Sequence, residues 1–302
     1  MTLIECVPNF SEGRDKSKVD QIKSAISAIP TVRILDVEMD SNHNRSVITF
    51  VCDDGKAVEA AFAGIKKAAE LIDMDKHTGE HPRFGAADVI PFVPLDDTKM
   101  SRCVQLAREL GKRVGDELNI PVFLYAEAAT RPERADLAAI RNKSFQYEQL
   151  KGAIKEEKWK PDFGPSEVGK AGASIIGARD FLIAYNVNLN ISDVEIGKKI
   201  ASALRARDGG LTFVKALAFY LKDRNIVQIS MNLTNFRKTP IYRAYELVKL
   251  EASRYGAYPI ESEIVGLVPE QALIDAAKFY LQLNGFDEHN LIERKINENV
   301  SE

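Results

Sequence analysis

The order of elements expected in residues 3–95 of this 302-residue chain returns in its second half, and this repetition is the strongest constraint on the fold. In the first half, short β-branched runs and amphipathic segments alternate as strand, helix, two strands, helix and strand. From about residue 179 the same order recurs, and "DVIPFVPLDD" finds a counterpart in "SEIVGLVPEQ". We therefore predict an α+β fold of two ferredoxin-like (βαββαβ) subdomains that arose by internal duplication, at residues 1–178 and 179–302.

A segment without periodicity follows the first repeat. Residues 97–160 are expected to form a helix, a strand and a charged helical stretch, and then "KPDFGPSEVGKAGAS" brings three glycines and two prolines. We interpret this segment as the joint between the halves. Because ligands favour interfaces between subdomains, it is also a candidate binding site. In the second repeat, Ser192 is expected to cap the helix that follows it.

Composition narrows the class of protein. With 45% hydrophobic residues the chain can bury a full core, and a net charge of −3 provides no cationic field to recruit nucleic acid or an anionic membrane. The sequence shows neither a signal peptide nor a run of ~18 apolar residues that would span a bilayer. The three cysteines are scattered and match neither a disulfide framework nor a zinc pattern. We expect a cytoplasmic protein without nucleic-acid or membrane partners.

Two histidines stand four residues apart in "DKHTGEHPRFGAADV", residues 75–89. This spacing suits zinc only on a helix, and Gly79 and Pro82 break helical geometry there. A third ligand is not apparent nearby, so we predict no metal. His77 is expected to be an ordinary solvated loop residue.

His81 differs from His77 in its neighbours. The following proline restricts its backbone to an extended conformation, and Glu80 and Arg83 place charges beside it. A histidine held in a rigid loop suits general acid–base catalysis. An ordinary loop residue is the alternative that these features leave open.

The stretch "GPSEVGKA", residues 164–171, nearly matches a phosphate-binding loop. Ala171 stands where the Mg²⁺-binding hydroxyl would be, and the expected strand and helix do not flank the loop, so a nucleoside triphosphate site is not predicted. Its glycines would still let backbone N–H groups approach a planar or anionic ligand.

Polar residues also gather at two strand ends. In "DVEMDSNHNRS", Asn44 and Arg45 come at the mouth of a strand, where a guanidinium can hold a carboxylate with two hydrogen bonds. Asn9 occupies a similar place near the N-terminus. The alternative for all three is a solvated turn.

Taken together and in order, several segments resemble the glutamate formiminotransferase domain, which in animals is the front part of formiminotransferase-cyclodeaminase. They are "ECVPNFSEG", "NRSVITF", "HTGEHPRFGAADVIPFVP", "PDFGPS", "GARDFLIAYNVNL" and "IVGLVP", and the resemblance runs from about residue 2 to residue 283. Since no room remains for a cyclodeaminase domain, the resemblance implies a stand-alone transferase.

The resemblance implies an activity and a set of site residues. The family transfers a formimino group from N-formimino-L-glutamate to N5 of tetrahydrofolate, and it forms homodimers with folate in a cleft between two ferredoxin-like subdomains. The catalytic histidine of its E-H-P-R motif falls on His81. Its folate-contacting loop falls on Gly164, Pro165, Ser166, Glu167, Val168, Gly169, Lys170, Ala171 and Gly172. This loop is one residue shorter here than in the animal form and lacks its tryptophan.

The chemistry agrees with these residues. N5 attacks the amidine carbon, and a histidine can take the N5 proton and deliver one to the leaving amine. The predicted catalytic residues are His81, Glu38 and Arg83, with Glu38 a candidate to orient the histidine or the amidine. Arg45, Arg83 and Lys170 are candidates to bind carboxylates, and Asn9 and Asn44 to contact substrate. We expect tetrahydrofolate as co-substrate, no metal, and only small-molecule partners apart from a second copy of the chain. Formyl transfer between N-formylglutamate and tetrahydrofolate, and a folate-binding module without turnover, are the alternatives.

Overall fold

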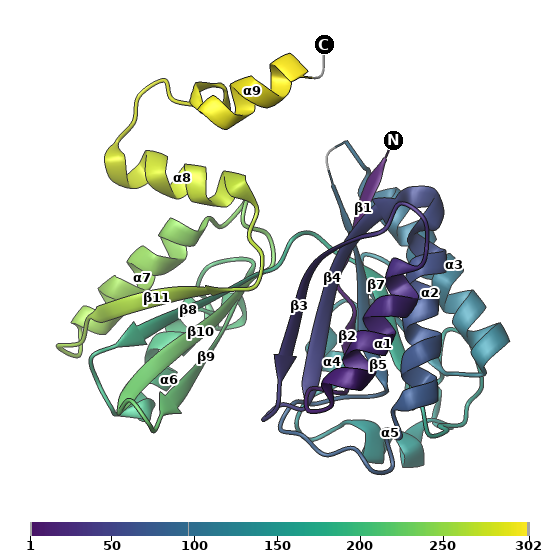
Figure 1. Ribbon diagram of the computed structural model, residues 1–302. Coiled ribbons are helices and arrows are strands. Elements are labelled where there is room, and N and C mark those ends of the chain that lie inside the picture. The colour runs from purple at the N-terminus through teal and green to yellow at the C-terminus, as the bar shows by residue number, and fades with distance from the viewer. Residues whose placement is uncertain (1, 96, 301–302) are drawn as a thin grey trace. The chain divides into compact units, whose positions relative to one another are not determined.

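The computed structural model describes residues 2–95 and 97–300 (Figure 1). The chain divides into two compact units, and the boundary falls between Asp180 and Phe181. We refer to them as the N-terminal unit and the C-terminal unit and describe each by itself. None of the described helices is long and apolar enough to cross a membrane.

The N-terminal unit is built on a seven-stranded sheet. Its elements are β1 (Leu3–Cys6), β2 (Asn9–Phe10), α1 (Lys16–Ser27), β3 (Arg33–Asp40), β4 (Arg45–Asp53), α2 (Asp54–Leu71), β5 (Ala87–Pro94), α3 (Met100–Leu118), β6 (Val122–Ala126), η1 (Pro132–Arg134), α4 (Leu137–Ile140), α5 (Tyr147–Ala153), η2 (Glu157–Trp159) and β7 (Ser174–Ala178). Strands β1 and β2 both lie between β4 and β5, and β3 pairs with the other side of β4. These antiparallel strands, with α1 and α2, form the predicted βαββαβ arrangement.

Three helices cover one face of this sheet (Figure 1). Helix α1 begins where the Asp15 carboxylate accepts hydrogen bonds from the N–H groups of Ser17 and Lys18, and its apolar stripe faces the core. The largest fully buried side chains of this core include Phe10, Phe50, Phe92 and Phe123. The sheet is therefore anchored on its helical side, and the ends of its strands carry the polar loops.

The C-terminal unit repeats the motif without additions to its sheet. Its elements are β8 (Ile183–Leu189), α6 (Val194–Leu204), η3 (Ala206–Asp208), β9 (Val214–Leu221), β10 (Ile226–Leu233), α7 (Ile241–Ser253), β11 (Pro259–Val265), α8 (Glu270–Leu281), η4 (Glu288–Asn290) and α9 (Ile292–Val300). The strand order β11-β8-β10-β9, antiparallel throughout, is that of a ferredoxin-like sheet. The predicted α+β class with two such subdomains is confirmed.

Two local predictions are wrong. The cap of α6 is Asp193 rather than Ser192, because the Asp193 carboxylate accepts from the N–H of Glu195. The glycine-rich segment is not the joint between the halves but lies inside the N-terminal unit, between β6 and β7. The reason is β7, which pairs in parallel with both β5 and β6 and so returns the chain to the same sheet before it leaves the unit.

Candidate functional site

A small polar hollow, which we call the histidine hollow, lies where the loop between α2 and β5 meets the beginnings of β4 and β5. We call residues 74–86 the histidine loop. The lining side chains come from four segments of the N-terminal unit and are Ser11, His43, Asn44, Arg45, His77, His81, Arg83 and Asp88. The structure thus brings together four of the residues predicted from sequence, Asn44, Arg45, His81 and Arg83.

Asn44 ties three of these segments together. It adopts a left-handed backbone conformation, φ 48°, which asparagine tolerates better than most residues. Its side-chain oxygen accepts from the N–H of Gly13 at 3.0 Å, and its amide group donates to the carbonyl of Thr78 at 2.9 Å. The Asn44 amide is therefore bonded to protein backbone, and a substrate contact of Asn44 remains a prediction.

His81 is held in one tautomer by its two neighbours. Its Nδ1 donates to the Pro82 carbonyl at 2.7 Å, and its Nε2 lies 2.8 Å from Nη1 of Arg45. Since a guanidinium only donates, Nε2 must carry the lone pair and the imidazole is neutral. Burial, and then the charges of Arg45 and Arg141, lower the pKa of His81 to about 3.

His77 has the opposite tautomer. Its Nε2 donates to the Asn44 carbonyl at 2.9 Å, and its Nδ1 accepts from Nε of Arg83 at 3.1 Å. Burial is the largest cause that lowers the pKa of this imidazole. The expectation of a solvated loop residue is wrong, because the loop folds back to the start of β4. His77 there links Asn44 and Arg83 through its two hydrogen bonds.

Arg83 uses its whole guanidinium within the protein. The side chain is 7% exposed and donates to His77, to Gln146 and to both carboxylate oxygens of Glu148, at 2.9 and 2.7 Å. Glu148 lies in α5, so this bidentate pair ties the histidine loop to that helix. Contact between Arg83 and a substrate carboxylate would require these bonds to break, and its catalytic role remains a prediction.

Arg45 and Glu38 lie on neighbouring strands, where Arg45 is opposite Asp40 and Glu38 is opposite Val47. Arg45 begins β4, where burial lowers its pKa and the carboxylates of Asp88, Glu38 and Asp40 favour its charge. Glu38, on β3, is half-buried, and burial and then Asp36 raise the pKa of its carboxyl while Arg45 lowers it. The side-chain amide of Asn9 donates to the Val7 carbonyl at 2.9 Å.

A buried ion pair behind these residues was not predicted. Asp88 and Arg141, 2% and 8% exposed at their side chains, approach to 2.8 Å. A sequence signal existed for Asp88, a charged residue directly before the apolar run "VIPFV". No comparable signal marks Arg141, which is far from the histidines in sequence and reaches them only through the fold.

The glycine-rich loop, residues 164–172, is hydrogen-bonded to both ends of the histidine loop. The carbonyls of Lys170 and Ala171 accept from the N–H groups of Met74 and Ala86, at 2.9 and 2.8 Å. Of the nine residues predicted to contact folate, five are exposed and two are buried: the exposed ones are Gly164, Ser166, Glu167, Gly169 and Lys170, and the buried ones are Val168 and Gly172. A Cβ at Gly164 would lie 2.4 Å from the Ile120 carbonyl, so protein and not open space lies beside that position.

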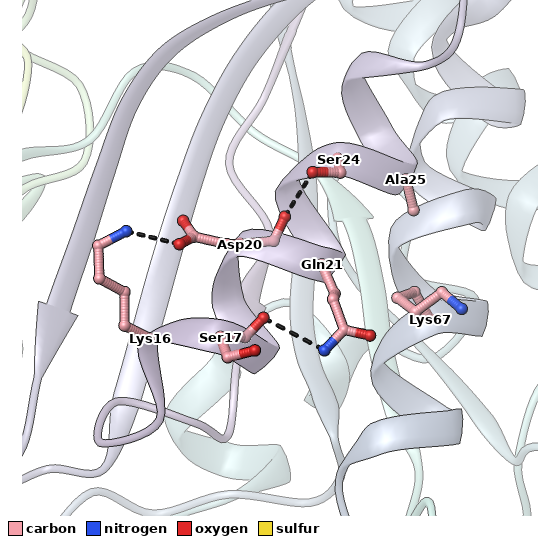
Figure 2. Close-up of a pocket in the computed structure, with 7 residues that line it drawn as sticks. All are labelled: Lys16, Ser17, Asp20, Gln21, Ser24, Ala25 and Lys67. Carbon is pink, nitrogen blue, oxygen red and sulfur yellow. Dashed lines mark hydrogen bonds and ion pairs between the residues drawn. The ribbon is translucent and has the colours of Figure 1, made fainter.

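A second hollow lies on the surface over α1 and α2 (Figure 2). Its polar groups bond to one another, as in the Lys16–Asp20 ion pair and the hydrogen bond from Gln21 to the Ser17 carbonyl. It contains no histidine or cysteine and does not involve the histidine loop. The histidine hollow is therefore the candidate site. Among the described residues, no three His, Cys, Asp or Glu side chains come together as a potential metal site.

Comparison with known proteins covers both units. Residues 3–179 match the family model of the formiminotransferase domain, N-terminal subdomain, and residues 184–300 match that of the formiminotransferase domain. The chain is 81% identical over 296 residues to the glutamate formimidoyltransferase of Thermoplasma acidophilum, with 98% of each chain covered. It is 46% identical to that of Streptococcus pyogenes serotype M1, with 96% of this chain and 97% of the relative covered. It is 45% identical to the formimidoyltransferase-cyclodeaminase of Rattus norvegicus, with 92% of this chain and 52% of the relative covered.

Proposed function

The chain belongs to the formiminotransferase family, and we propose that it transfers the formimino group from N-formimino-L-glutamate to N5 of tetrahydrofolate, releasing L-glutamate. It is an enzyme, a folate-dependent one-carbon transferase. The observation that connects this reaction to the site is the neutral His81 with its lone pair on Nε2, held 2.8 Å from a guanidinium.

The reaction requires one proton to move between two nitrogens. N5 of the folate forms a bond to the amidine carbon, and the resulting tetrahedral centre collapses by breaking the bond from carbon to the glutamate nitrogen. His81 Nε2 accepts the proton that N5 loses and delivers it to that nitrogen, so the imidazole returns to its neutral form. An imidazole near its ordinary pKa is suited to both steps.

Arg45 regulates when that lone pair is available. An Arg45 N–H donates to Nε2, and with its pKa of about 3 the His81 imidazole is a weak base. The donor substrate carries two carboxylates, which bind a guanidinium more strongly than a neutral imidazole does. When a carboxylate draws Arg45 away, Nε2 becomes free and loses a neighbouring cation, so its basicity rises.

Other residues are proposed to bind the two substrates. We propose that Glu38, whose charge favours that of Arg45, accepts a hydrogen bond from the amidine N–H groups. The exposed residues of the glycine-rich loop, Lys170 above all, would meet the folate and its anionic glutamate tail. Since Arg83 and Asn44 are bonded within the protein, we assign them to holding the histidine loop in place.

Four finer statements belong to this proposal. Tetrahydrofolate is the co-substrate, no metal takes part, the protein is a homodimer, and it is located in the cytoplasm. All three cysteines are buried and free, which agrees with a reducing compartment. Activity that falls on EDTA treatment and returns with one metal ion would contradict the second statement.

Turnover assays test the proposal directly. Formiminoglutamate and formylglutamate are compared side by side, and formimino transfer should dominate. His81→Asn should lower kcat by roughly 10²–10⁴-fold while folate still binds. A matched control is His289→Asn, since His289 is an exposed histidine of η4 in the C-terminal unit and does not line the hollow around His81. Near-normal turnover of the His81 variant would refute the assignment.

A further inference from the structure

The backbone around Asp88 departs from a regular ladder. Asn9 of β2 pairs with Val89, and the next residue, Phe10, pairs with Ala87, so one step on β2 corresponds to two steps on β5. Asp88 is the extra residue of this β-bulge. Bulges redirect side chains, often beside active sites, and here the carboxylate is turned into the histidine hollow.

Asp88 is bound on one side and incompletely bound on the other. Its Oδ1 accepts from the N–H of Phe84 at 2.7 Å, and Nη2 of Arg141 lies 2.8 Å from its Oδ2. Neither Oδ2 of Asp88 nor Nε of Arg141 has a well-oriented hydrogen-bond partner among the described residues. A carboxylate oxygen with spare acceptor capacity, buried in this way, strongly attracts any further donor.

Arg45 lines the same hollow as Asp88 and is the candidate for that further donor that the charges indicate. The charge of Asp88 stabilises the Arg45 guanidinium, and Arg141 opposes it. Two guanidinium groups therefore compete for one buried carboxylate, and Arg141 is the one in contact. Arg45 is left to place its Nη1 against His81.

We propose that Arg141 is a positioning residue of the transfer reaction: by occupying Asp88, it leaves Arg45 available to His81 and then to the carboxylate of the donor substrate. Without Arg141, the Arg45 guanidinium pairs with the Asp88 carboxylate and leaves His81. The part that concerns substrate rests on the function proposed above, whereas the position of Arg45 in the free protein does not.

The His81 imidazole reports the position of Arg45. Other charged and titratable groups lie in the histidine hollow or act on His81 and Arg45 through their charge. They are His43, His77, Arg83, Asp88, Arg141, Glu38 and Asp40. If Arg141→Gln removes one cation and lets a second move away, the midpoint of the His81 titration should rise by about one pH unit or more. The midpoint is read by NMR, and with four histidines in the chain the His81 signal is identified by its loss in His81→Asn.

Kinetics supply the second measurement. Arg141→Gln should raise KM for formiminoglutamate by roughly tenfold, because each 1.4 kcal/mol of lost binding is a factor of ten, and KM for folate should change far less. Arg141→Lys keeps a cation on Asp88 and should stay within about threefold of the parent KM. The double variant Asp88→Asn/Arg141→Gln removes the capturing carboxylate and should also stay within about threefold of the parent KM.

A matched control exists in the same unit. Arg134 and Asp162 form another buried ion pair, 4% and 7% exposed, and neither lines the histidine hollow. Arg134→Gln should lower thermal stability as Arg141→Gln does, yet leave the His81 midpoint unchanged. A purely structural role for Arg141 predicts the same result for both variants.

These outcomes decide the inference. An unchanged His81 midpoint in Arg141→Gln, or a double variant with a KM as high as that of Arg141→Gln, overturns it. If Arg141→Gln does not fold, a tenfold rise of KM in Arg141→Lys or in the double variant overturns it instead. The titration is made without substrate, so it tests this inference independently of the proposed function. If the His81 midpoint shifts in Arg141→Gln but His81→Asn turns over normally, the proposed function is refuted and this inference stands.

Discussion

Replacing Gly172 by alanine tests how the histidine loop is held. At this position the glycine-rich loop crosses the histidine loop backbone to backbone, and Gly172 has a φ of +73°. An added Cβ would lie 2.2 Å from the Phe84 carbonyl oxygen and 2.5 Å from Cα of Gly85. Both contacts are with backbone, so no side-chain rotation relieves them.

The cost follows from two contributions. An alanine in the left-handed region costs about 1–2 kcal/mol, and the steric conflict costs about 1–3 kcal/mol, because the two segments must separate at the hydrogen bonds that flank the crossing. The nearest of these joins the N–H of Ala173 to the Phe84 carbonyl at 3.0 Å. Gly172→Ala should therefore lose roughly 2–5 kcal/mol of unfolding free energy.

Urea denaturation followed by circular dichroism measures this loss. Gly169, in the same loop, is the control, since a Cβ there meets nothing within 4 Å and its φ is not positive. Gly169→Ala should be neutral or stabilise by up to about 1 kcal/mol through the unfolded chain. If the two variants have the same unfolding free energy, the crossing does not hold the loop and the reasoning is wrong.

Three further predictions concern single side chains. His77→Phe should destabilise by about 1–3 kcal/mol, because it leaves Nε of Arg83 and the Asn44 carbonyl unpaired; an unchanged denaturation midpoint would contradict this. Lys170→Ala should weaken the salt dependence of folate binding, measured as Kd against ionic strength, and an unaltered slope would remove Lys170 from the folate site. Stability should fall as pH drops from about 6.5 towards 3, because the unfolded chain protonates His81 and the folded one, with its pKa of about 3, does not; melting curves of His81→Gln should show a weaker acid dependence.

The sequence predicted those parts of the fold that local patterns determine. Hydrophobic periodicity identified the repeated βαββαβ order, because each element there is long enough to show its own period. Strand β7 was missed because "SIIGA" is a short apolar run after a glycine-rich segment, and its partners β5 and β6 are identified only by non-local pairing. The misplaced joint follows from that one omission.

In the candidate site, too, the sequence predicted what local patterns determine and missed what depends on non-local contacts. His81 was identified from its neighbours in the chain, and its role stays a prediction until the variants are measured. His77 was misjudged because the acceptor and donor that hold it, Asn44 and Arg83, act through a fold of the loop that spacing does not reveal. Arg141 had no local signal at all, since its importance depends on a carboxylate that only the bulge turns towards it.

That bulge has an evolutionary consequence. Deletion of the single codon for residue 88 would give β5 a regular ladder with β2, with one main-chain irregularity fewer and no buried carboxylate to accommodate. Such a protein would leave the Arg141 guanidinium buried without its ion-pair partner and the N–H of Phe84 without its acceptor, so the deletion would cost stability. It would also lose the anion against which two guanidinium groups are arranged. A descendant with that deletion would remain a recognisable member of the family by sequence, and the missing residue, rather than any substitution, would mark it as one that had taken up another task.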